Sequence, residues 1–217
     1  ILAAGFNLQK DWPQTKEQAW DKITQAFSKD FFVIKDLAYQ MEPYLTDEQL
    51  KEIDKHANII FLIRSPKATI ASGIYAYEQD NNPDGFTSEE AGFVHMKKLF
   101  DRFKNLSITL YSIEAEKYLA NPSVVLQNYF SCFGLEFNNN ILVIKSVPKE
   151  ILNTNPAYCV WGDLWFKNAF ETSFVEPINL SYEPSKKYQN IDHKKISKFL
   201  KEHMEAYFYM QNNGVVP

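Results

Sequence analysis

The chain alternates short apolar runs with longer segments in which apolar residues recur at helical spacing. Three runs rich in β-branched and aromatic residues predict buried strands, at residues 31–34, 58–63 and 108–113. Segments with an apolar residue every three or four positions predict amphipathic helices, at residues 15–28, 46–56, 66–77, 87–104, 122–133 and 191–211. Strands separated by helices favour parallel βαβ topology, so we predict an α/β fold.

Polar residues mark the starts of several predicted helices. A Thr followed three positions later by Gln or Glu, the pattern of a capping box, opens three of them: Thr15 with Gln18, Thr46 with Gln49 and Thr87 with Glu90. The last helix carries an apolar stripe of Ile196, Leu200, His203 or Met204, and Tyr207. The pattern weakens between residues 138 and 187, where we expect loops and short helices.

Composition indicates one folded domain over residues 1–217. Hydrophobic residues make up 45% of the chain and aromatic residues 15%, which is enough to build a core. The net charge of -4 argues against a nucleic-acid partner. No apolar run reaches the ~20 residues of a membrane-spanning helix, and the sequence indicates no metal site. The start at Ile1, without Met or a signal-peptide pattern, indicates that native residues precede it.

Two cysteines, Cys132 and Cys159, stand far apart and lack metal-ligand spacing. This low cysteine content is typical of a reducing compartment, so we expect a cytoplasmic protein.

The segment from Asn58 to Tyr77 carries the clearest candidate chemistry. Arg64 follows a predicted buried strand directly, Pro66 suits the first turn of a helix, and Ser72 follows Arg64 by eight positions. An arginine can grip a phosphate with two N–H donors, a serine adds a neutral donor, and the helix N-terminus adds partial positive charge. A lone arginine after a strand is more often a surface residue, so the prediction of an anion site depends on these neighbours.

This segment resembles the second cofactor motif of sulfotransferases that use 3′-phosphoadenosine 5′-phosphosulfate (PAPS). In that family a strand is followed by Arg-x-Pro-Lys or a similar turn, with Ser eight positions after the Arg. Arg64, Pro66, Lys67 and Ser72 match this pattern. The resemblance implies that Arg64 and Ser72 hold the nucleotide 3′-phosphate. It also implies a three-layer fold with a parallel sheet flanked by helices, of the P-loop-containing nucleotide hydrolase type.

Weaker parallels extend the resemblance along the chain. The residues VIKD are similar to a family strand that ends in lysine, and LQNYFSCFGLEF is similar to a family helix and its following turn. The resemblance implies a transferase that moves a sulfuryl group from PAPS, without a metal, to a hydroxyl or amine on a small molecule or glycan. Lys35 would then stabilise the donor's charge, and Asp36 would act as general base.

The chain departs from the family at two places. It contains no glycine-rich Lys/Arg-Ser-Gly-Thr-like loop for the 5′-phosphosulfate. Lys35-Asp36-Leu37 stands where many members carry Lys-Thr-His, and Asp36 could instead cap the helix that follows it. Two alternatives therefore stay open: a catalytically inactive nucleotide-binding or protein-interaction module, and a P-loop nucleotide kinase. The four histidines share no motif, so we expect structural roles for them.

Overall fold

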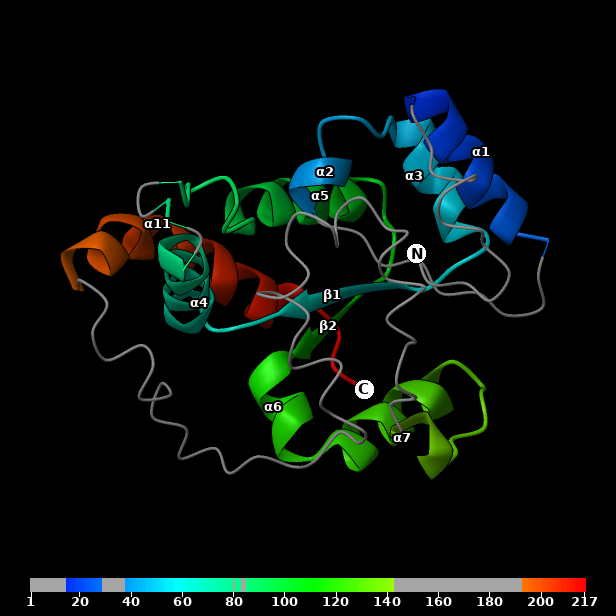
Figure 1. Cartoon of the computed structure of the whole chain (residues 1–217). Helices are drawn as coiled ribbons and strands as arrows, with labels where there is room; N and C mark the ends of the chain where they lie inside the picture. Colours follow the sequence, from blue (N-terminus) through cyan, green and yellow to red (C-terminus); the bar gives the residue numbers. More distant parts are fainter. Residues whose placement is uncertain (1–14, 29–37, 80, 83–84, 143–192) are drawn as a thin grey trace, which may run out of the picture.

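The computed structural model describes residues 15–28, 38–79, 81–82, 85–142 and 193–217 (Figure 1). Its sheet consists of β1 (Ile59–Ile63) and β2 (Leu110–Glu114), which run parallel and pair from Ile59 with Leu110 to Ile63 with Glu114. Helices surround this pair. The prediction of a mixed α/β fold with parallel strands is confirmed at this level.

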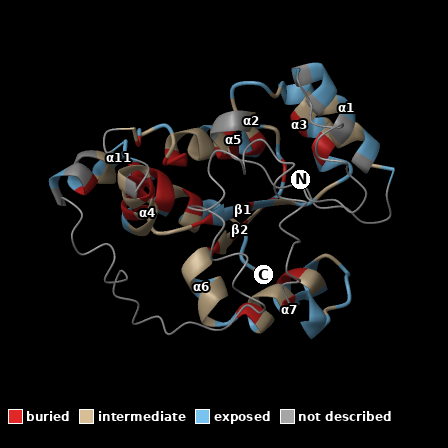
Figure 2. Ribbon diagram, in the orientation of Figure 1, coloured by how far each residue is buried: buried red, intermediate tan, exposed pale blue. Residues whose placement is uncertain are grey.

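Three helices pack together beside the strands. The crossover from β1 to β2 contains α4 (Pro66–Gln79) and α5 (Phe93–Asn105), and α11 (His193–Asn213) packs against both helices and both strands. Their core includes Phe61, Ile63, Phe100, Phe103 and Met210. The α4 helix, which begins two residues after Arg64, is buried along much of its length (Figure 2). Its packing therefore anchors the chain on that side of Arg64.

The other side of the strands carries two short helices. In Figure 1, α6 (Ala115–Ala120) and α7 (Pro122–Cys132) lie on the opposite side of the strands from α5. The Tyr129 hydroxyl of α7 donates a hydrogen bond of 2.5 Å to the Ser112 carbonyl of β2. A single turn, η1 (Asn139–Leu142), follows and packs on α7.

The α7 helix ends as the sequence predicts. Gly134 has φ 69°, in the left-handed region that glycine adopts readily, and the Leu135 N–H donates to the Phe130 carbonyl at 2.8 Å. This bond satisfies one of the last free carbonyls of the helix.

Near the C-terminus the chain returns to the sheet. Val215 forms a parallel bridge with Tyr111, on the edge of β2 that does not pair with β1. The Val215 N–H donates to the Leu110 carbonyl at 2.8 Å, and the Ser112 N–H donates to the Val215 carbonyl at 3.1 Å. The C-terminal residues therefore extend the sheet by one more short stretch.

Two predicted capping residues are confirmed. The Thr15 hydroxyl caps α1 (Lys16–Ala26) by accepting the Gln18 N–H, and Thr46 and Gln49 form a complete capping box at α3 (Asp47–Asp54). The prediction of a helix starting at Thr87 is wrong. Thr87 and Glu90 do exchange hydrogen bonds, but Gly92 then takes a left-handed φ of 78° and α5 begins only at Phe93.

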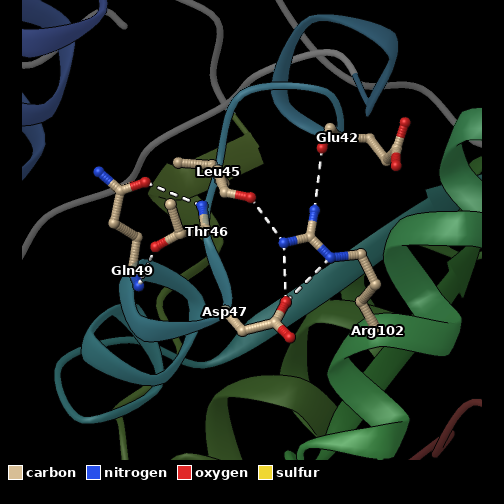
Figure 3. Close-up of polar contacts among 6 residues, drawn as sticks. All are labelled: Glu42, Leu45, Thr46, Asp47, Gln49 and Arg102. Atoms are coloured by element: carbon tan, nitrogen blue, oxygen red, sulfur yellow. Dashed lines mark hydrogen bonds and ion pairs between the residues drawn. The ribbon is translucent and has the colours of Figure 1, made fainter.

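Arg102 of α5 holds the connection between α2 (Ala38–Met41) and α3 (Figure 3). Its guanidinium donates to the Glu42 carbonyl at 2.9 Å, to the Leu45 carbonyl at 2.6 Å and to the Asp47 carboxylate at 2.8 Å. The turn therefore depends on a side chain more than fifty residues later in the sequence.

Two sequence predictions lie outside the described residues. These are the strand at residues 31–34 and most of the loop region at residues 138–187.

Candidate functional site

The carboxyl ends of β1 and β2 lie at the same edge of the sheet. The last residue of β1, Ile63, pairs with the last residue of β2, Glu114. Arg64 and Ser65 therefore continue from one strand where Ala115 and Glu116 continue from the other. Ligands of α/β proteins bind at such edges, so the two turns together form the candidate site.

Arg64 is half-buried directly after β1. Within the described part of the chain its guanidinium has neither a hydrogen bond nor an ion pair. Taking a charge partly out of water costs free energy unless it finds a counter-ion. The arrangement is therefore suited to binding an anion.

Ser72 lies on α4, six residues beyond its first residue, Pro66. A helix rises about 1.5 Å per residue, so Ser72 lies roughly 9 Å along α4 from its start. Its side chain is half-buried and has a partner within the protein. Arg64 and Ser72 thus belong to one strand–turn–helix unit, with the helix starting at the predicted proline, whereas Lys67 is exposed.

Glu116, in the first turn of α6, contacts the turn between β1 and α4. Its Oε1 accepts the Ser65 N–H at 2.8 Å, and its Oε2 is buried without a hydrogen-bond partner among the described residues. A carboxylate of the chain itself therefore occupies the backbone N–H of the residue that follows Arg64.

Glu114 is held by two other helices. It forms an ion pair with Lys117 of α6 and accepts hydrogen bonds from Gln211 at 2.9 Å and Tyr207 at 3.5 Å, both on α11. Burial raises the pKa of Tyr207 to about 12, and the negative charges of Glu114 and Glu116 contribute. Tyr207 is therefore a neutral hydrogen-bond donor at physiological pH.

Sequence reasoning missed both acidic residues. The signal was available, because they stand at the end of a predicted strand parallel to the one that precedes Arg64. The predicted strand ended at Ile113, however, and the residues after it had no assigned element.

The two predicted catalytic residues, Lys35 and Asp36, lie outside the described residues. Two carboxylates that come soon after them in the sequence, Glu42 and Asp47, have partners among the described residues. The Glu42 carboxylate lies 3.0 Å from His95 Nδ1, and Asp47 binds Arg102.

A separate polar pair joins Ser88 to α11. The Ser88 hydroxyl lies 3.2 Å from His203 Nε2, and His203 is fully buried. A Ser–His nucleophile needs an acid on the other ring nitrogen, but His203 Nδ1 has no hydrogen-bond partner among the described residues. The described residues therefore supply no third group that would orient the His203 ring. Of the two alternatives predicted for the stripe on the last helix, His203 is buried and Met204 is only partly buried.

The described residues contain no group of three His, Cys, Asp or Glu side chains that could hold a metal ion. Among the same residues, no helix is long and apolar enough to cross a membrane. Comparison of the chain with protein-family models, with curated proteins and with solved structures found no match.

Proposed function

We propose that the chain binds a 3′-phosphorylated adenosine nucleotide at the carboxyl end of β1 and transfers a sulfuryl group from PAPS to a hydroxyl or amine. The acceptor would belong to a small molecule or a glycan. The observation that carries the proposal is the half-buried guanidinium of Arg64, which has no partner among the described residues. It lies at the end of a parallel strand that leads at once into a helix.

The chemistry of the turn supports a phosphate ligand. Arg64 can donate two parallel hydrogen bonds to phosphate oxygens, and the positive end of α4 favours negative charge nearby. Pro66 has no N–H, and the Ser65 N–H is bound to Glu116, so these two residues add no free backbone donor. Binding would therefore depend mainly on the side chains of Arg64 and Ser72.

We also propose that the sheet contains more parallel strands than β1 and β2. A three-layer sheet of the P-loop type would contain β1 and β2 as neighbouring parallel strands, with helices on both sides. The predicted strand at residues 31–34 would add Lys35 and Asp36 to the same carboxyl edge. We retain one domain over residues 1–217 and a cytoplasmic location as parts of this proposal, the latter because the chain has only two cysteines.

In the proposed reaction, the acceptor oxygen or nitrogen attacks the sulfur atom and the bond from sulfur to the bridging phosphate oxygen breaks. Adenosine 3′,5′-bisphosphate leaves, and the acceptor proton passes to Asp36. Lys35 would stabilise the charge that develops on the donor oxygens. An ordinary Asp pKa is near 4, so burial must raise it for efficient base catalysis.

Calorimetric titration of the 217-residue chain with adenosine 3′,5′-bisphosphate and with 5′-AMP tests the binding step. We expect clear preference for the bisphosphate. Arg64→Ala should weaken bisphosphate binding by about tenfold or more, because charged hydrogen bonds contribute roughly 1.5–3 kcal/mol. Lys67→Ala removes a neighbouring exposed cation and should change the affinity by less than about twofold.

Equal binding of both nucleotides, or an unchanged Arg64→Ala variant, would refute the proposed site. A transfer assay with labelled PAPS and a panel of acceptors then distinguishes an active sulfotransferase from a catalytically inactive nucleotide-binding module. Selective binding without transfer would favour the inactive nucleotide-binding module.

A further inference from the structure

The carboxylate of Glu116 links the two turns at the edge of the sheet. It reaches from the first turn of α6 to the Ser65 N–H, across 51 residues of sequence, and the hydrogen bond is partly buried. The parallel register makes this contact possible, because Ile63 and Glu114 end their strands side by side.

This hydrogen bond acts on the backbone of Arg64. The Ser65 N–H belongs to the same planar peptide unit as the Arg64 carbonyl and Cα. Holding that N–H in place constrains the peptide plane that follows the Arg64 Cα, while β1 constrains the chain before it. Together they limit the direction in which the Arg64 side chain leaves the turn. Glu116 itself is not paired with the guanidinium, so its effect on Arg64 passes through the backbone.

No other carboxylate of the described edge is available for this task. The Glu114 oxygens are engaged by Lys117, Gln211 and Tyr207. The negative charge of Glu116 would repel a phosphate bound nearby. Its hydrogen bond, rather than its charge, is therefore the feature that could favour anion binding.

We infer that Glu116 is a positioning residue for the nucleotide 3′-phosphate: it orients Arg64 by holding the Ser65 N–H. This inference rests on the proposed function. Glu116 belongs to the segment formed by β2 and α6. The residues that the sequence predicted for the site lie instead at Lys35 and Asp36 and in the segment formed by β1 and α4.

Two substitutions separate the hydrogen bond from the charge. Glu116→Ala removes both, whereas Glu116→Gln keeps an oxygen acceptor on a side chain of the same length and removes only the charge. We expect Glu116→Ala to weaken binding of adenosine 3′,5′-bisphosphate by about tenfold, which corresponds to about 1.4 kcal/mol. We expect Glu116→Gln to bind within about twofold of the original chain, or more tightly. Glu136→Ala, which removes an exposed carboxylate beyond α7, is the matched control and should leave binding unchanged.

Hydrogen exchange of the Ser65 amide, followed by NMR without nucleotide, reads the contact directly. Exchange should accelerate in Glu116→Ala and stay close to the original rate in Glu116→Gln. A Glu116→Ala variant that keeps full bisphosphate affinity would overturn the inference and leave the proposed function standing, as would a Gln variant that binds as weakly as the Ala variant. Absence of bisphosphate preference in the unsubstituted chain would overturn both, so the two failures are distinguishable.

Discussion

His203 is fully buried on α11, with its ring tilted against Phe93 at 5.5 Å between centroids. Burial lowers the pKa of His203 below its ordinary value of 6.5, and the nearby Glu202 carboxylate opposes this effect only in part. The folded protein therefore keeps this ring neutral under conditions in which the unfolded chain would protonate it.

The stability of the protein should depend on pH through His203. Below pH 6.5 the unfolded chain binds more protons at this position than the folded chain, so the free energy of unfolding falls as the pH falls toward the lowered pKa. Denaturant unfolding at several pH values between 7 and 5 measures this slope. His203→Gln removes the titrating group, so its slope should be shallower. Equal slopes in both chains would contradict the assignment.

At the scale of single residues, the sequence predicted some positions and missed others for physical reasons. Arg64 could be placed because a buried strand, a proline and a serine surround it at informative spacings. Glu116 could not, because its significance depends on the register between two strands that lie far apart in the chain. Local patterns carry no information about such pairings.

At the scale of elements, the α2–α3 connection shows how one side chain can fix a turn. Arg102 satisfies two backbone carbonyls and the Asp47 carboxylate at once (Figure 3). A lysine has a compact ammonium group and cannot reproduce this planar fork of donors. We therefore expect that only an arginine at position 102 can make all of these hydrogen bonds together.

We expect Arg102→Ala to lower the free energy of unfolding by about 2 kcal/mol, because several charge-assisted hydrogen bonds are lost. Arg102→Lys should recover only part of this loss. Lys98→Ala, at an exposed position on the same helix, should change stability by less than about 0.5 kcal/mol. Chemical denaturation of the three variants gives these values. An Arg102→Ala variant with unchanged stability would show that the connection between α2 and α3 does not depend on this side chain.

The elements that the sequence predicted well are those with strong local signals. The capping-box residues Thr46 and Gln49 predict the start of α3. Gly134, which adopts a left-handed backbone conformation, predicts the end of α7. The sequence did not predict the α6 helix, because the helix spans only six residues and has no side-chain hydrogen bond at its N-cap. The start of α5 was misplaced because the pair Thr87 and Glu90 stabilises a turn before the helix.

At the scale of the whole molecule, the sequence predicted the parallel sheet from the alternation of strands and helices. It could not predict that the C-terminal segment returns to β2, because the bridge from Val215 to Tyr111 joins parts of the chain with no shared pattern. The position of α11 against α4 and α5 is also a long-range result, although its apolar stripe was visible in the sequence.

The parallel pairing of β1 with β2 has a consequence for the rate at which the protein folds. Two parallel strands cannot be joined by a tight hairpin, so the pairing of Ile59 with Leu110 requires closure of the long crossover that contains α4 and α5. Phe100 of α5 contacts Phe61 of β1 with 5.2 Å between ring centroids, so this pair joins the crossover to the first strand.

We therefore expect Phe100→Leu to slow refolding, whereas Tyr129→Phe, which removes the bond from α7 to the Ser112 carbonyl, should mainly speed unfolding. Stopped-flow measurement of both arms of the chevron distinguishes these effects, and the reverse pattern would place α7 in the folding nucleus. If the expectation holds, the edge that carries Arg64 is assembled early, by the same non-local step that limits how fast the chain folds.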